Sequence, residues 1–188
     1  MKQKIFITSY IILTLVMFVL PFFTADGYSI ISHTTSQLGA QHTKNSWIMN
    51  FTFALMGITS IYAGWTHFHK YWLHKILLLS FGLSLVFTAI FSHAPITPNL
   101  AFSLREDELH SLFASTTGFS FTILAISTGF IKDTRNKKFL PIFVGILATT
   151  LSMMMFTIES YMGIWQRLIF ITSFAWLIFE FNDKVDRK

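Results

Sequence analysis

The sequence predicts an all-α polytopic membrane protein in which six transmembrane helices form one bundle, with the N-terminus and the C-terminus both cytoplasmic. Three observations support this fold class. Six apolar segments approach the ~20 residues that cross ~30 Å of hydrocarbon as a helix. The composition is 53% hydrophobic and only 12% charged. Eleven of the fourteen Lys and Arg residues fall into alternate gaps between the segments, as the positive-inside rule requires.

The expected helices cover residues 5–24, 47–67, 74–92, 109–131, 139–158 and 161–180 of a single domain, 1–188. Lys2 and Lys4 precede the first helix as in a signal peptide, but this segment is too long for an h-region and lacks a small-residue cleavage site. We therefore expect it to remain as a spanning helix. Trp47 and Trp165 begin two helices at the predicted outer face, where indole rings prefer the headgroup zone.

Inside the expected helices, small residues recur at a spacing of four, which is typical of membrane helices whose backbones pack closely. The pairs are Ser60 and Gly64, Ala114 and Gly118, and Gly145 and Thr149. They support a packed bundle but identify no particular interface.

Two of the predicted outer connections are long, whereas the inner ones are short and basic. The first covers residues 26–46, and its segment 30–38 mixes apolar residues with Ser, Thr and His, a pattern compatible with a short interfacial helix. The second covers residues 93–108 and ends in the charged run 105–108. Loops of this length in a small protein are usually functional or disordered.

The net charge of +5 does not indicate nucleic-acid binding, because the cations gather on one side of the predicted membrane. Eleven cations and four acids lie on the cytoplasmic side, so we expect the partner there to be anionic lipid headgroups of the cell inner membrane. The absence of Cys excludes disulfides and thiolate metal sites. No P-loop, GxGxxG or GxSxG motif occurs, and we expect no cofactor.

Arg167 is the leading candidate functional residue, because a charge inside an apolar segment is costly and is seldom kept without a partner or a task. A rise of 1.5 Å per residue places its Cα roughly 10 Å below the outer end of the last helix. One interpretation is an anion clamp for a phosphate or carboxylate headgroup from the outer leaflet. The other is a structural ion pair, with Glu159, Glu108 or Asp26.

Histidines are the second group of candidates. The predicted outer side holds His33, His42, His93 and His110. A catalytic zinc site needs such ligands to converge around an open position for water. Because no HExxH or HxxxH spacing occurs and the four residues lie on different loops and helix ends, we expect no metal, with His93 and His110 as the ligands if one binds. The same two positions are poorly placed for haem, which needs His residues at matched depth on facing helices.

Four short motifs follow one another around these helices. They are Ser-Gln-Leu-Gly at 36–39, Trp-Ile-Met-Asn-Phe at 47–51 with Gly57, His110 at a helix start, and Gly-Ile-Trp-Gln-Arg-Leu at 163–168. In order and spacing they resemble the bacterial and archaeal family called domain of unknown function 998, over nearly the whole chain. The resemblance implies the six-helix topology, and the characteristic positions that it implies are Ser36, Leu38, Gly39, Trp47, Asn50, His110 and Arg167. Gln37 stands where an acidic residue is common, and His93 stands near a frequent Asp. The resemblance implies no activity.

Three hypotheses of function follow. The first is binding or transport of a small amphiphile or anionic lipid headgroup in an outer-leaflet polar pocket, whose candidate residues are Arg167, His110, Asn50, Ser36 and Glu159. The second is an outer-face, metal-assisted membrane hydrolase or transferase that uses His110, His93 and Glu159. The third is a non-catalytic membrane scaffold or accessory subunit. No catalytic motif favours an enzyme, and we prefer the first hypothesis.

Overall fold

The computed structural model describes residues 1–183, and helices are its only regular secondary structure over that range. Six helices in it are long and apolar enough to cross a membrane, which confirms the predicted fold class at this level. They are α1 (Lys2–Val19) with its short continuation η1 (Leu20–Phe23), α3 (Ser46–His67), α4 (Trp72–Ile90), α5 (Leu104–Ile131), α6 (Arg135–Thr157) and α7 (Met162–Asn182). The predicted cytoplasmic charges of Lys184, Asp186, Arg187 and Lys188 lie outside the described residues.

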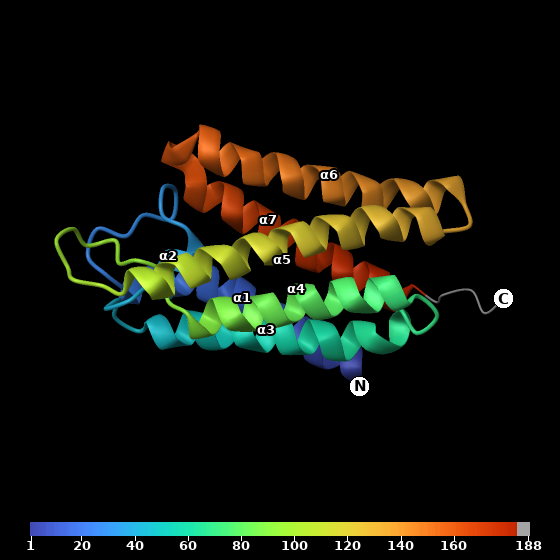
Figure 1. Cartoon of the computed structure of the whole chain (residues 1–188), viewed down its shortest axis with the longest axis horizontal. Helices are drawn as coiled ribbons and strands as arrows, with labels where there is room; N and C mark the ends of the chain where they lie inside the picture. Colours follow the sequence, from blue (N-terminus) through green and yellow to red (C-terminus); the bar gives the residue numbers. More distant parts are fainter. Residues whose placement is uncertain (184–188) are drawn as a thin grey trace.

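The helices form an elongated bundle in which chain neighbours pack side by side (Figure 1). α3 packs against α4, α4 against α5, α5 against α6, and α6 against α7. α1 contacts both α3 and α7, and it therefore joins the beginning of the chain to its end. α7 runs obliquely to the other helices (Figure 1).

The two long connections, 24–45 and 91–103, lie at the same end of the bundle (Figure 1). We call this the outer end, following the charge pattern, and the opposite one the inner end. The N-terminus and the end of α7 both lie toward the inner end. Which side of the membrane each end meets stays a prediction.

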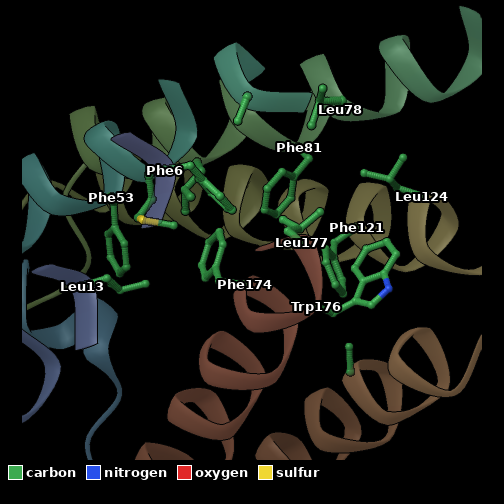
Figure 2. Packing of buried hydrophobic residues seen from close by; sticks show 14 of the residues in the cluster. Phe6, Leu13, Phe53, Leu78, Phe81, Phe121, Leu124, Phe174, Trp176 and Leu177 are labelled. Carbon is green, nitrogen blue, oxygen red and sulfur yellow. The ribbon is translucent and has the colours of Figure 1, made fainter. Parts of the chain in front are cut away.

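A row of aromatic rings fills the centre of the bundle (Figure 2). Phe174 of α7 lies 6.3 Å from Phe6 of α1 and 5.9 Å from Phe81 of α4, between ring centroids. Phe81 contacts Phe121 of α5 at 5.7 Å, and Phe121 contacts Trp176 at 5.6 Å. Large buried rings of this kind carry most of the packing contacts in a core. They fix α7 against α1, α4 and α5, and so fix the position of its outer end.

Glycines allow the closest approaches between helices. A Cβ on Gly57 would lie 2.3 Å from the carbonyl oxygen of Gly82, so α3 and α4 meet backbone to backbone. Gly64 and Gly145 also face neighbouring helices, with side-chain atoms 2.6 Å from an added Cβ. Gly118 has nothing within 4 Å. Small-residue packing is therefore present at two of the predicted pairs, whereas the Gly118 position lies open.

α5 begins at Leu104 rather than at position 109, which corrects the predicted boundary. Ser103 is its N-cap, and the Ser103 side chain accepts a hydrogen bond from the backbone N–H of Glu106. Glu106 and Asp107 then stand in the first turn, where carboxylates complement the positive end of the helix dipole. The charged run that was expected to be loop is therefore helical, and its side chains have fixed positions.

The first outer connection contains one short helix, α2 (Thr35–Leu38), within the segment where an interfacial helix was considered. A capping box holds it, because the Thr34 side chain accepts from the Gln37 backbone N–H and the Gln37 side chain accepts from the Thr34 backbone N–H. Gln37 thus does in this chain what a Glu does in the same box.

Candidate functional site

Arg167 is 3% exposed and is surrounded by oxygen acceptors. Its three nitrogens donate to five oxygens, at 2.8 to 3.3 Å: the backbone carbonyls of Met17, Ile30, His33 and Gly163, and the hydroxyl of Tyr28. None of the ion pairs between described residues includes Arg167. The pairing considered with Glu159, Glu108 or Asp26 is therefore not made within the described chain, and carbonyl oxygens take its place.

These contacts tie the first outer connection to the start of α7. Tyr28 accepts from Arg167 and lies 2.8 Å from the carbonyl oxygen of Thr34, to which its hydroxyl donates. Burial raises the pKa of this phenol, although the neighbouring guanidinium acts in the opposite direction. Gly163 makes the approach possible, because an added Cβ would lie 2.3 Å from the carbonyl oxygen of Ile30.

Gln166, the neighbour of Arg167, fixes α2. Its side-chain oxygen accepts from the backbone N–H of Thr35 at 2.7 Å and from that of Ser36 at 3.3 Å. These are N–H groups of the first turn of α2, which have no partner within the helix. α7 therefore positions Ser36 through a direct side-chain contact.

Asn50 joins the first outer connection to the second. Its Nδ2 donates to the carbonyl oxygen of Gly39 at 3.0 Å and to the Ser92 hydroxyl at 3.5 Å. A Cβ on Gly39 would lie 2.0 Å from Asn50 Oδ1, so only glycine fits against this side chain. Oδ1 itself is buried and has no hydrogen-bond partner.

His110 is 2% exposed, and its side chain lies against the C-terminal end of α4. Its Nδ1 lies 3.0 Å from the carbonyl oxygen of Thr88 and 2.8 Å from that of Phe91. Because carbonyl oxygens only accept, Nδ1 carries the proton, and in a neutral ring Nε2 is left as an acceptor. Nε2 is buried and has no partner.

His93 lies beside His110, with the ring centroids 5.1 Å apart. Nδ1 of His93 is 2.8 Å from Oδ1 of Asp107, and the same oxygen accepts from the backbone N–H of Ala94 at 2.7 Å. Burial lowers the pKa of His93, and the carboxylate of Asp107 opposes this shift only in part. The nearby carboxylate favours the tautomer of the neutral ring that has its proton on Nδ1, although the contact does not have the geometry of a regular hydrogen bond.

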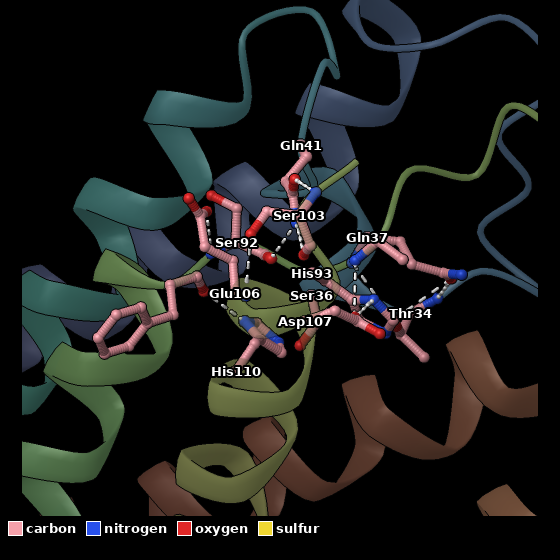
Figure 3. A network of polar contacts seen from close by, with 12 residues as sticks. Thr34, Ser36, Gln37, Gln41, Ser92, His93, Ser103, Glu106, Asp107 and His110 are labelled. Atoms are coloured by element: carbon pink, nitrogen blue, oxygen red, sulfur yellow. Dashed lines mark hydrogen bonds and ion pairs between the residues drawn. The ribbon is translucent and has the colours of Figure 1, made fainter. Parts of the chain in front are cut away.

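Gln41 binds the second outer connection at both ends. Its side chain donates to the carbonyl oxygens of Ser92 and Ser103 at 3.1 and 3.0 Å and accepts from the backbone N–H of Ser103 at 2.8 Å. Its backbone N–H donates to the carbonyl oxygen of His93 at 2.9 Å. Figure 3 shows Gln41 above the group formed by Ser36, His93, Asp107 and His110.

The structure places three of the candidate residues at the same end of the bundle. Ser36, Asn50 and His110 come from α2, α3 and α5 and lie at the outer end with His93 and Asp107; we call these five residues the outer polar cluster. Arg167 does not belong to the cluster, but it binds the first outer connection, which leads into α2. Glu159 lies apart, exposed in the short helix η2 (Glu159–Tyr161), and makes no ion pair among the described residues.

Sequence reasoning missed Asp107 and Gln41. Asp107 was assigned to a loop, although Ser103-Leu104-Arg105-Glu106 fits the S/T-x-x-E pattern that marks a helix start. Gln41 left no such signal, because it binds backbone atoms of a distant segment. In the described part of the chain, no group of three or more His, Cys, Asp and Glu side chains is placed to hold a metal ion.

A second buried polar group lies at the inner end, and it too was missed. Glu180 of α7 is 5% exposed and lies 2.9 Å from Nε2 of His67 and 2.6 Å from Nζ of Lys132. Lys132 also contacts Asp183 at 3.2 Å. Burial acts to raise the pKa of Asp183, but the hydrogen bond from Lys132 and the charges of Lys132 and Lys137 hold it below its usual value. These contacts join α3, α5 and α7 at the inner end.

Comparison with known proteins gives one result. A family model described as a protein of unknown function, DUF998, matches residues 11–179. No curated protein and no solved structure matches the chain. The matched region contains the motifs at 36–39, 47–51 and 163–168 that carry the resemblance, together with His110. The chain is a multi-pass membrane protein that belongs to the DUF998 family.

Proposed function

We propose that this protein binds the headgroup of a small amphiphile at the outer polar cluster, which the amphiphile reaches from the outer leaflet of the inner membrane. One observation carries the proposal: Nε2 of His110 is buried and unpartnered. Buried polar atoms without a partner are rare in native proteins and costly, and each requires an explanation. A bound ligand group that completes the hydrogen bond is the explanation that we favour.

The surroundings of His110 support this choice. Side chains from α2, α3, α5 and the second outer connection converge at one end of the bundle, while the adjoining surface of α5 is apolar. Phe113, one turn further along α5 than His110, stacks on Phe91 and on the exposed Phe87. A polar cluster next to an apolar surface suits a molecule with a headgroup and a tail.

We assign Arg167 a positioning role in this site. Every N–H direction of its guanidinium already has an oxygen acceptor, so a direct contact with an anion requires the loss of at least one of these bonds. Its contribution is to hold the connection that carries α2 and Ser36. Glu159, which is exposed near the start of α7, is a candidate for contact with a headgroup as it enters.

At the inner end we propose contact with anionic lipid headgroups of the cytoplasmic leaflet. Lys4, Arg135 and Lys138 are exposed there and belong to the cations that the charge pattern places inside. A basic side chain near a charged bilayer surface contributes ~1 kcal/mol of attraction. These contacts orient the bundle and are separate from the outer polar cluster.

Photo-crosslinking tests the outer site. The full chain in lipid nanodiscs is exposed to an amphiphile that carries a diazirine next to its headgroup, and the labelled peptides are mapped. We expect labelling within residues 34–50 and 91–110 that an excess of unlabelled amphiphile removes. Labelling spread evenly over lipid-facing helices such as α6, without competition, contradicts the proposal.

A further inference from the structure

We infer that the headgroup bound at the outer polar cluster is a hydrogen-bond donor, an amine or a hydroxyl group, and that Nε2 of His110 accepts its hydrogen bond. This inference rests on the proposed function and names the chemical class of its ligand. It departs from the anionic headgroup that the sequence suggested. Four features of the cluster carry it.

The first feature is the tautomer of His110. Two carbonyl oxygens of the last turn of α4 lie within 3.0 Å of Nδ1, and both need a donor because they have no partner within the helix. The proton of the neutral ring is therefore held at Nδ1. Nε2 has only a lone pair to offer, and a ligand that completes this site brings its own proton.

The second feature is the neighbouring ring. Oδ1 of Asp107 lies beside Nδ1 of His93, which favours the proton of that ring on Nδ1 and leaves Nε2 without a proton. The ring centroids of the two imidazoles are 5.1 Å apart, and each ring has an Nε2 that can accept a hydrogen bond. Both histidines therefore favour a ligand that donates a hydrogen bond.

The third feature is Asn50, because only the nitrogen of its side-chain amide has hydrogen-bond partners. Nδ2 is engaged by Gly39 and Ser92, while the buried Oδ1 has no donor. Nε1 of Trp165, on α7, is a buried donor without a partner near this end, and a single neutral N–H does not balance the charge of an anion. In the outer polar cluster, Nε2 of His110 and Oδ1 of Asn50 are acceptors without a partner, whereas Nδ1 of His93 lies 2.8 Å from the carboxylate of Asp107 without the geometry of a regular hydrogen bond.

The fourth feature is charge. Glu106 and Asp107 stand in the first turn of α5, beside His110. Arg167, the buried cation of this region, directs all of its donors to oxygens of the protein, whereas Arg105, in the same turn as the two carboxylates, is exposed. Beside His110 an anionic headgroup meets the carboxylates and no buried guanidinium with an unused donor, whereas an ammonium or hydroxyl group meets acceptors.

Three probes with similar tails and different headgroups test the inference: dodecylamine, monolaurin and dodecyl phosphate. Their affinities are measured for the full chain in nanodiscs. We expect dodecylamine or monolaurin to bind more tightly than dodecyl phosphate, and the better of the two identifies the donor as an amine or a hydroxyl. This order is obtained with the unmodified protein and requires no variant.

His110→Asn then locates the contact. The Asn amide places a donor where Nδ1 stood, so the carbonyls of Thr88 and Phe91 keep their partner, while the acceptor at Nε2 is removed. We expect about tenfold weaker binding of the preferred probe. His42→Asn is the matched control, because His42 is exposed and its φ of 58° is one that Asn tolerates; its affinity stays unchanged.

The outcomes separate the two proposals. Tightest binding of dodecyl phosphate overturns the inference and leaves amphiphile binding in place. Equal affinities of the His110→Asn variant and the unmodified protein for the preferred probe also overturn the inference, because they place the ligand elsewhere. No saturable binding of any probe overturns the proposed function as well.

Discussion

Arg167 is a charge buried without a carboxylate. Its planar fork spreads five N–H donors over five oxygens of two elements and a loop, which a Lys ammonium with three donors cannot reproduce. Hydrogen bonds to a charged group are stronger than neutral ones, and together they offset the cost of removing the charge from water. At this position the guanidinium determines the conformation of a loop.

Replacing Arg167 therefore affects stability before it affects binding. Arg167→Met leaves buried carbonyls without donors, and we expect a loss of about 3 kcal/mol, within the range for breaking a buried charged network. Thermal unfolding in a mild detergent measures it, with the exposed Arg105→Met as the control. Equal unfolding temperatures for the two variants contradict this account.

His93 gives the outer end a pH dependence. Its pKa is lowered in the folded protein by burial, so the unfolded chain binds more protons below about pH 6.5 and stability decreases as the pH falls through that value. Asp107 and His110 are the titratable groups that face it. We expect His93→Asn, which retains a donor toward Asp107, to lose less stability than the unmodified protein between about pH 8 and pH 5. Parallel pH profiles of thermal unfolding contradict the assignment to His93.

The outer connections are shaped by the helices that they contact. Gly163 in the first turn of α7 packs against the backbone carbonyl groups of Ile30 and His33. Their oxygen atoms would lie 2.3 and 2.4 Å from an added Cβ. Close contact of a loop with a helix in this way requires glycine, whatever the hydropathy of the segment. The loop and α7 therefore behave as one unit.

A pair of Gly→Ala changes tests this coupling. Gly163→Ala forces backbone atoms apart, and we expect a loss of about 1–3 kcal/mol. Gly118→Ala is the matched control in another helix: nothing lies within 4 Å, and removing a helical glycine is neutral or stabilises by up to about 1 kcal/mol. Thermal unfolding of both variants is the measurement. A Gly163→Ala protein as stable as the Gly118→Ala protein would show that the loop does not rest on α7.

Elements were predictable to the extent that local physics determines them. Hydropathy and charge give the six spanning helices, because a helix in lipid must be long and apolar. The start of α5 was also available, in the cap formed by Ser103 and Glu106. The hydrogen-bond partners of Arg167 were not predictable, because backbone carbonyl groups of a loop leave no pattern in the sequence. Of the candidate residues, Ser36, Asn50 and His110 lie at the same end of the bundle, whereas the contact of Asp107 with His93 depended on the correct helix boundary.

At the scale of the whole molecule, two polar groups are separated by an aromatic core. The outer polar cluster and the inner contacts of Glu180 lie at opposite ends of α7 and its neighbours, and the row from Phe6 to Trp176 lies between them. The closed centre favours a binding site that opens to one face of the membrane. The orientation of the bundle then decides which leaflet supplies the ligand.

Labelling with a membrane-impermeant maleimide tests that orientation. The chain has no cysteine, so single replacements give no background. Asp26 and His69 are both exposed and lie at opposite ends of the bundle. We expect Asp26→Cys to react from the outside of intact cells and His69→Cys to react only after permeabilisation. The reverse labelling pattern would mean that the outer polar cluster lies on the cytoplasmic side of the membrane.

The central claim is that His110 Nε2 meets a donor from an amphiphile, and an experimental structure of the protein with dodecylamine or monolaurin tests it most directly. We predict density for the headgroup ~3 Å from Nε2, with Nδ1 still bound to the carbonyls of α4. Density for the ligand elsewhere, or a protein group donating to Nε2, would contradict the account.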